Sequence, residues 1–139
     1  MRVVLDLNVL ISASIAPRGI PAALMDAWAE ERFELIVSPE VLAELEDVLS
    51  RKRLRRRLTP EEADAFVARV RLGSRLVDDP PPEDAPITDD PGDDYLVALA
   101  RAAQADYLVS GDPHLTGLSH PAPPVLTPSQ LMDRLQTPE

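Results

Sequence analysis

Residues 3–8, with the sequence Val3-Val4-Leu5-Asp6-Leu7-Asn8, decide the fold prediction for this chain. The first three are apolar and mostly β-branched, which is typical of a strand buried in a parallel sheet. Asp6 follows this run directly, at the end of the strand where ligand sites of open α/β sheets lie. The segment therefore predicts an opening strand that carries an acid into a binding site. The alternative is that Asp6 only caps the short helix that follows.

The rest of the chain alternates between strand and helix patterns. Ser38 and Thr59 precede prolines at expected first helical positions, and Thr59 and Thr127 each begin a capping box. The expected strands are residues 2–6, 33–37, 107–109 and 125–126, with a short strand or edge piece at 76–77. The expected helices are residues 8–14 and those that begin near residues 20, 39, 60, 91 and 128. This alternation predicts an α/β fold with a mainly parallel sheet, and it leaves the strand order open.

Two further segments receive only a general structural assignment. Residues 78–92 are rich in Asp and Pro and lack periodicity, so we expect a surface loop there. Leu24, Met25 and Trp28 share one helical face, which fits either the core or an interface between two copies of the chain.

Composition limits the class of protein. A chain of 139 residues with 45% hydrophobic residues suits one domain that spans residues 1–139. No apolar run reaches the roughly 20 residues that cross a bilayer, and residues 1–5 do not look like a secretory signal. The absence of cysteine excludes disulfides and fits a cytoplasmic location. A net charge of −10 argues against general nucleic-acid affinity, but it permits a nuclease that combines metal-binding acids with one basic patch.

Three further acids stand at the edges of expected elements: Glu44, Asp93 and Asp112. Glu44 lies at the margin of the apolar stripe of its helix, and Asp93 lies on the inward face of its helix, whereas Asp94 lies toward solvent. Asp112 follows the strand at 107–109 and mirrors Asp6, with Gly111 expected to permit a tight turn. Carboxylate oxygens are the ligands that Mg²⁺ and Mn²⁺ prefer. The set therefore predicts a divalent-metal site, and such sites most often serve phosphodiester cleavage.

Each of these acids also has a structural alternative. Glu44 fits a salt-bridged residue at the rim of the core, since an unpaired buried carboxylate is costly. Asp93 fits simple stabilisation of a helix dipole, and Asp112 fits a turn residue before Pro113. The metal interpretation rests on the four acids taken together.

In the order of its motifs the chain resembles the PIN-domain family of metal-dependent ribonucleases. The matching segments are residues 3–10, residues 38–45 with Glu44, residues 90–94 and residues 105–112. It is similar to bacterial PIN proteins that are toxin components of toxin–antitoxin pairs, a group with VapC-type toxins among its relatives. The resemblance implies a three-layer α/β/α sandwich and an endoribonuclease that uses one or two Mg²⁺ or Mn²⁺ ions. It also implies an antitoxin partner and a homodimer.

The resemblance assigns roles to residues. The family's acidic quartet of catalytic metal ligands corresponds to Asp6, Glu44, Asp93 and Asp112. Asn8 stands two positions after the first acid, as in many relatives. Asp94 stands where relatives often have a polar residue and is expected to assist metal binding. Ser110 replaces a frequent Thr and is expected to hydrogen-bond a ligand carboxylate. Residues 113–115 depart from the charged pair that usually follows the last acid.

A basic run follows the helix that bears Glu44. It holds six of the 14 basic residues, namely Arg51, Lys52, Arg53, Arg55, Arg56 and Arg57. We interpret this run as a clamp on the phosphate backbone of RNA. The alternative is favourable charge at a helix C-terminus, and an acidic antitoxin tail is a third occupant of the same surface.

Other functions fit the sequence less well. One alternative is a catalytically silent interaction module that kept the fold, and another is a nuclease of the same kind that acts on DNA. A haloacid-type hydrolase also opens with an acid after a strand, but it uses Asp-x-Asp and a downstream lysine. Here the second position is Asn8, and the sole lysine lies within the basic run.

Overall fold

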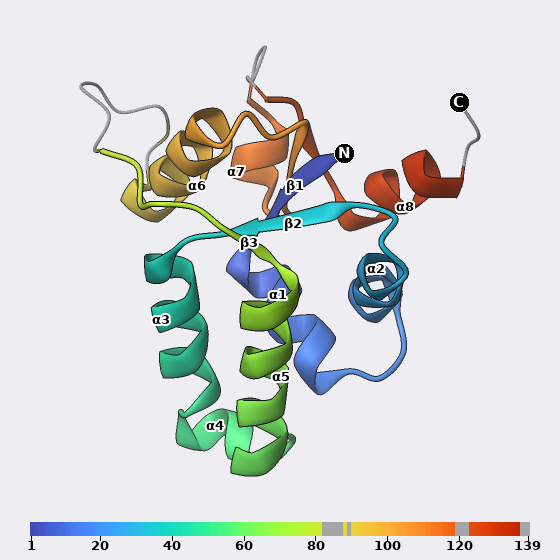
Figure 1. Cartoon of the computed structure of the whole chain (residues 1–139), viewed down its shortest axis with the longest axis vertical. Helices are drawn as coiled ribbons and strands as arrows, with labels where there is room; N and C mark the ends of the chain where they lie inside the picture. The colour runs from blue at the N-terminus through green and yellow to red at the C-terminus, as the bar shows by residue number, and fades with distance from the viewer. Residues whose placement is uncertain (82–87, 89, 119–122, 137–139) are drawn as a thin grey trace.

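The residues described by this computed structural model, 1–81, 88, 90–118 and 123–136, form a five-stranded parallel sheet flanked by helices (Figure 1). In chain order the elements are β1 (Arg2–Leu5), α1 (Leu7–Ile15), α2 (Ile20–Ala29), β2 (Glu34–Val37), α3 (Pro39–Leu49), α4 (Lys52–Arg55), α5 (Pro60–Gly73), β3 (Arg75–Leu76), α6 (Pro91–Ala102), β4 (Tyr107–Val109), α7 (Pro113–Thr116), β5 (Val125–Leu126) and α8 (Pro128–Gln136). The strand order is β3-β2-β1-β4-β5, and every pairing is parallel.

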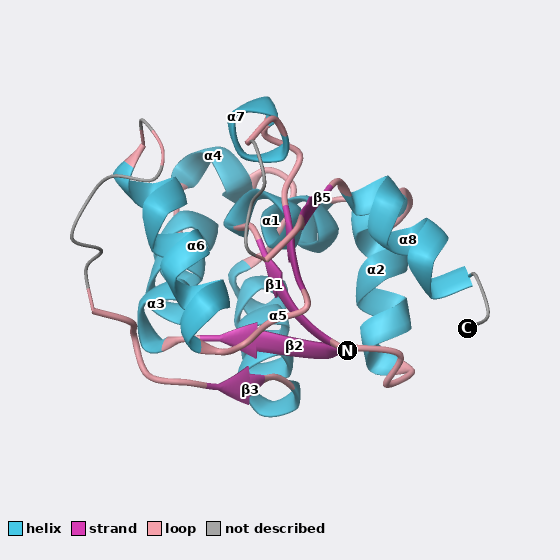
Figure 2. Ribbon diagram, turned by 90° about the horizontal axis from the view of Figure 1, so that it is seen from above, coloured by secondary structure: helices cyan, strands magenta, loops and turns pink. Residues whose placement is uncertain are grey.

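The helices make two outer layers. Helices α1, α3 and α5 cover one face of the sheet, and α6 and α7 cover the other, as Figure 1 shows. Seen from above, α2 and α8 lie side by side at the end of the molecule opposite α3 (Figure 2). The predicted three-layer α/β/α sandwich is therefore confirmed.

The order of the strands locates the region where a ligand is expected. The chain runs from β1 outward to β2 and β3, and then returns to the other side of β1 to add β4 and β5. The direction of winding therefore reverses between β1 and β4. Ligands of open α/β sheets bind beyond the carboxyl ends of the strands at such a point.

The core is built from the strands and from the apolar faces of the helices. Val3, Val4 and Leu5 are each no more than 1% exposed, as expected for a strand covered on both faces. Leu24 and Trp28 of α2 are also buried, so the apolar face of this helix belongs to the core of the chain. This settles the choice between core and interface that the sequence left open.

Most local predictions are confirmed. Ser38 caps α3, Thr59 forms a full capping box with Glu62, and Thr127 exchanges hydrogen bonds with Gln130. The first strand ends one residue earlier than predicted because Asp6 is already the N-cap of α1. The predicted loop at 78–92 ends at Asp90, the N-cap of α6, and residues 82–87 and 89 lie outside the described part of the chain.

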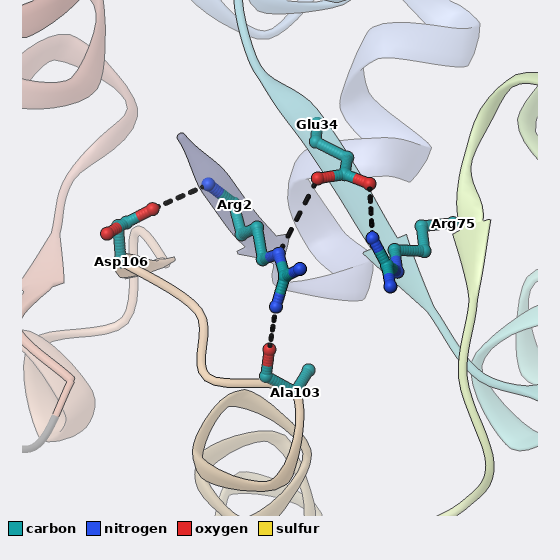
Figure 3. Close-up of polar contacts among 5 residues, drawn as sticks. All are labelled: Arg2, Glu34, Arg75, Ala103 and Asp106. Atoms are coloured by element: carbon teal, nitrogen blue, oxygen red, sulfur yellow. Dashed lines mark hydrogen bonds and ion pairs between the residues drawn. The ribbon is translucent and has the colours of Figure 1, made fainter.

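The amino ends of the strands carry paired charges, shown in Figure 3. Glu34 pairs with Arg2 at 3.6 Å and with Arg75 at 3.2 Å, which joins the starts of β1, β2 and β3. The backbone N–H of Arg2 donates to Asp106, and its guanidinium donates to the carbonyl of Ala103. Charges at this edge of the sheet are thus matched by partners on neighbouring elements.

Among the described residues no single helix is both long and apolar enough to cross a membrane. Helices α1 and α2 pass that test only as a pair, and they meet at an angle of 94°.

Candidate active site

A cavity of about 420 Å³ opens beyond the carboxyl end of β1, between the start of α1 and the first two turns of α3 and α6. Its lining consists of Asp6, Leu7, Asn8, Glu40, Val41, Glu44, Pro91, Gly92, Asp93, Tyr95 and Leu96. Three of the four predicted acids therefore face one space, although they come from three separate elements. The position agrees with the switch point of the strand order.

Asp6 caps the first helix and also lines the cavity, whereas its role as a metal ligand remains a prediction. Its Oδ1 accepts a hydrogen bond from the backbone N–H of Asn8 at 3.2 Å, so it caps α1. Its Oδ2 accepts a hydrogen bond from Ser110 at 2.8 Å, and the residue still lines the cavity while only 8% exposed. The carboxylate is therefore held in one orientation at the cavity wall.

Ser110 joins the fourth acid to this arrangement. Its Oγ also accepts the backbone N–H of Asp112 at 3.0 Å, and the carbonyl of Asp112 accepts the N–H groups that start α7. Asp112 is half-buried and is not part of the cavity lining. Ser110 thus connects the backbone of Asp112 to the carboxylate of Asp6, and the place of Asp112 in the site remains a prediction.

Gly111 does not need to be glycine in this structure. Its φ is outside the left-handed region, and a Cβ built on it meets no atom within 4 Å. The prediction that glycine enables a tight turn here is therefore wrong, because ordinary backbone geometry already brings Asp112 back toward Ser110.

The two acids at the start of α6 are separated as the helical wheel predicts. Asp93 is 9% exposed and lines the cavity, which confirms its inward position. Asp94 is half-buried and its carboxylate accepts the backbone N–H of Thr88 at 2.6 Å, so it fixes the chain before α6. Asp94 does not line the cavity, and its expected assistance in metal binding remains a prediction.

Helix α3 contributes two carboxylates to the cavity. Glu44 and Glu40 lie one turn apart on the same ridge, and both are exposed. This exposure is compatible with the predicted place of Glu44 at the margin of the apolar stripe. Sequence reasoning also assigned no role to Glu40, although its spacing from Glu44 is the signal that could have indicated it.

The donor set determines which ion this cavity suits. Every titratable side chain in its lining other than Tyr95 is a carboxylate, and hard cations such as Mg²⁺ and Mn²⁺ take oxygen ligands. Within the described part of the chain, no three His, Asp or Glu side chains already have the arrangement of a metal site. Carboxylates that converge without a cation repel one another. The oxygen donors of this cavity therefore suit a divalent cation, although they do not already have the arrangement of a metal site.

A hydroxyl chain that sequence reasoning missed lies at the rim of the cavity. Tyr95 of α6 donates to Asp79 at 2.6 Å and bonds Ser38, the N-cap of α3, at 2.5 Å. Burial, followed by the bond to Asp79, raises the pKa of Tyr95, and the bond from Tyr95 lowers the pKa of Asp79. Tyr95 and Asp79 have no periodic relation in the sequence, so no local pattern could have paired them.

The basic run lies away from the cavity. Residues 52–55 form α4, which follows the C-terminal end of α3, while the cavity adjoins the first two turns of that helix (Figure 1). Leu54 and Leu58 are buried and anchor the run, and Arg51 pairs with Asp47 at 3.1 Å. Contact of this run with RNA remains a prediction, and the run lines no part of the acidic cavity.

Comparison with known proteins gives one family and several similar folds. The family model described as PIN domain matches residues 2–114. An uncharacterized protein of Methanocaldococcus jannaschii, MJ1680, is 44% identical over 45 residues, which cover 32% of this chain and 29% of that protein. The match thus spans less than a third of this curated relative.

Solved structures resemble more than nine-tenths of the chain. PAE2754 from Pyrobaculum aerophilum superposes with a TM-score of 0.68 at 16% identity, covering 97% of this chain and 89% of that one. VapBC2 from Rickettsia felis, bound to a DNA fragment from its promoter, gives 0.61 at 18% identity over 91% of this chain and 97% of that one. FitAcB from Neisseria gonorrhoeae gives 0.57 at 18% identity over 91% and 98%. At these identities the likeness is one of fold.

Proposed function

Because the chain belongs to the PIN-domain family, we propose that it is a divalent-metal-dependent endoribonuclease that cleaves phosphodiester bonds of RNA. The observation that carries this proposal is the meeting of Asp6, Glu44 and Asp93 in one cavity at the switch point of the sheet. Members of this family are generally nucleases. An acidic cavity alone would repel a phosphate, so the proposal includes Mg²⁺ or Mn²⁺ as the cofactor.

The residues that would hold the ion are Asp6, Glu44 and Asp93, with Asp112 beside them. A bound divalent cation would offset their charge and polarise both the scissile phosphate and the attacking water. Asp6 is oriented in advance by the hydroxyl of Ser110 and by the backbone N–H of Asn8. The carboxylates are also the groups in the cavity that can accept the proton of the attacking water.

The first experiment tests the acid most firmly fixed by the fold. Asp6→Asn keeps the size of the side chain and its acceptor oxygen but removes the charge. We expect cleavage of a single-stranded RNA in Mn²⁺ to fall by about 100-fold or more, since loss of a ligand charge weakens the ion that the reaction needs. Asp106→Asn is the matched control because Asp106 lies at the opposite edge of the sheet and bonds Arg2. Equal cleavage by wild type and the Asp6 variant would rule out this mechanism.

A second arm of the same assay determines whether the substrate is RNA or DNA. A protein can distinguish RNA from DNA through the 2′-hydroxyl and the geometry that it imposes. We expect the RNA strand to be cut and a DNA strand of the same sequence to survive. The reverse result would make the protein a DNA nuclease with the same site.

We also propose that the protein is the toxin component of a toxin–antitoxin pair. The support is the similarity of its fold to VapBC2 and FitAcB, which are toxin–antitoxin complexes. Induced expression should arrest growth of a bacterial host, and Asp6→Asn should relieve the arrest. Arrest by both forms would indicate toxicity without catalysis, as expected for a silent interaction module.

A further inference from the structure

The two helices that carry acids on opposite sides of the cavity are joined by a hydroxyl chain. Tyr95 projects from α6, two residues after Asp93, and its OH lies 2.5 Å from the Oγ of Ser38 at the start of α3. The same OH lies 2.6 Å from Asp79, whose Oδ1 also accepts the backbone N–H of Glu40 at 3.1 Å. Both contacts therefore fix Tyr95 to the first turn of the helix that bears Glu44.

The direction of the hydrogen bonds follows from the chemistry of the groups. The Asp79 carboxylate is an acceptor only, so Tyr95 donates to it. The phenol oxygen then accepts from the hydroxyl of Ser38, while Ser38 Oγ accepts the backbone N–H of Val41 at 3.3 Å. Tyr95 and Ser38 thus each donate one hydrogen bond and accept another, and the phenol ring is held at the rim of the cavity.

The connection satisfies one buried polar group, because Ser38 is fully buried and its hydroxyl, which accepts from Val41, donates its hydrogen to Tyr95. Tyr95 itself is only half-buried, so water can reach part of its side chain. Asp79 lies on the exposed segment after β3. What the chain of bonds accomplishes is to hold the start of α3 against the start of α6, on either side of the acidic cavity.

We propose that Tyr95 is a positioning residue, which sets the separation of Glu44 and Asp93 through its bonds to Ser38 and Asp79. This inference rests on the proposed metal-dependent function, because the separation matters for a cation shared by the two acids. Tyr95 itself holds no ion in this proposal. It acts by holding the two helices in place. Loss of its hydroxyl therefore weakens binding of the cation and leaves the rate of the chemical step, once the cation is bound, nearly unchanged.

The test compares the same substitution at the two tyrosines of the chain. Tyr95→Phe removes the hydroxyl from the rim of the cavity. Tyr107→Phe removes one that accepts from Arg134 on α8 at 3.0 Å, outside the cavity lining. We expect Tyr95→Phe, which removes both hydrogen bonds of the phenol, to weaken Mn²⁺ binding about fivefold in calorimetry, a change on the scale of the net contribution of a single hydrogen bond. Tyr107→Phe should leave Mn²⁺ affinity unchanged.

The dependence of the cleavage rate on Mn²⁺ concentration provides a second measurement, and a purely structural role of Tyr95 would leave this dependence unchanged. For Tyr95→Phe, RNA cleavage should be reduced at low Mn²⁺ and restored at saturating Mn²⁺, so kcat stays close to that of the wild type. Asp79→Ala should reproduce this behaviour, whereas Asp79→Asn, which keeps an acceptor oxygen for Tyr95, should restore most of the affinity. Unchanged Mn²⁺ affinity in Tyr95→Phe and Asp79→Ala would overturn the inference.

A third measurement needs neither metal nor RNA. The chain has no cysteine, so Ala43→Cys on α3 and Ala102→Cys on α6, both exposed, give two unique sites for spin labels. Adding Tyr95→Phe should broaden the distance distribution between the labels, and adding Tyr107→Phe should not. An identical distribution in all three proteins would overturn the inference. Failure of the wild type to cleave RNA would instead count against the proposed function alone.

Discussion

Ser110 Oγ donates a 2.8 Å hydrogen bond to Asp6 Oδ2, and both residues are buried just beyond the carboxyl ends of two adjacent parallel strands. The same oxygen accepts the backbone N–H of Asp112 at 3.0 Å. One buried hydroxyl therefore orients the acid after β1 and the backbone that carries the acid after β4. The bond joins residues 104 positions apart, so it exists only because β1 and β4 pair.

Removal of this hydroxyl should cost both stability and activity. Ser110→Ala leaves a buried carboxylate oxygen of Asp6 without its donor, which costs about 1–3 kcal/mol of unfolding free energy. We expect cleavage of RNA in Mn²⁺ to fall at least about tenfold, the usual effect of losing a group that orients a metal ligand. Urea denaturation and initial cleavage rates measure the two effects.

Ser110→Thr is the control because it keeps the hydroxyl. It should retain most of the activity if the extra methyl fits, whereas a deficit equal to that of Ser110→Ala would show that packing and not the hydrogen bond is responsible. Full activity in Ser110→Ala would contradict the role given to the serine.

Metal binding should stabilise the fold measurably. An ion that binds the folded chain but not the unfolded chain adds about 2.7 kcal/mol at a concentration of 100 times its Kd. We expect Mn²⁺ to raise the Tm of the wild type, and Glu44→Gln to lose most of this increase because it removes one charge from the cavity. Glu61→Gln, at an exposed position in the first turn of α5, should keep the full increase. If the Tm of the wild type does not change when Mn²⁺ is added, this would contradict a metal site in the cavity.

Two glycines should respond oppositely to the same substitution. A Cβ at Gly73 would lie 2.7 Å from the ring of Trp28, which is itself buried, so Gly73→Ala should destabilise the chain by about 1–3 kcal/mol. A Cβ at Gly111 meets nothing within 4 Å, so Gly111→Ala should be neutral or stabilise by about 0.5 kcal/mol through the unfolded state. Chemical denaturation distinguishes the two, and a strong loss at Gly111 would restore the idea that its turn requires glycine.

The capping box of α5 should make stability depend on pH. The backbone N–H of Thr59, with a further contribution from its side chain, lowers the pKa of Glu62 below its usual value of 4.5. A carboxyl group whose pKa is lowered by folding stabilises the fold above its unfolded pKa and loses that contribution as pH falls through its folded pKa. We therefore expect the difference in unfolding free energy between wild type and Glu62→Gln to be constant at neutral pH and to shrink below about pH 4.5. A difference that stays constant down to pH 2 would exclude an ionised cap.

The local parts of the fold could be predicted from the sequence because their causes are local. Ser38 and Thr59 bond N–H groups three residues away, and the inward position of Asp93 follows from its spacing to Leu96 and Val97. The strand order could not be predicted, since β1 pairs with β4 across most of the chain. That pairing nevertheless decides where Asp112 stands relative to Asp6.

The candidate site shows the same division. Asp6 and Asp93 could be found because each lies at a defined position of its own element. The bond from Tyr95 to Asp79 could not, because Asp79 lies in a segment without periodicity. The exposure of Glu44 could not be predicted, since the helical wheel describes only its own helix and not the hollow beside it.

The basic run should act on RNA binding and not on the cleavage step. It begins beyond the C-terminal end of α3, whereas the acids line the other end of that helix, so its arginines would contact phosphates distant from the scissile bond (Figure 1). Substitution of Arg55, Arg56 and Arg57 by Ala should raise KM with kcat unchanged, which marks the loss of uniform binding. The slope of log affinity against log salt should fall by about 2, as expected for three phosphate contacts on a single strand. Substitution of the same three residues by Lys should preserve the slope because charge and not geometry determines it. A fall in kcat with an unchanged KM would instead place the run next to the reacting phosphate, and that would contradict the geometry of α3 and α4.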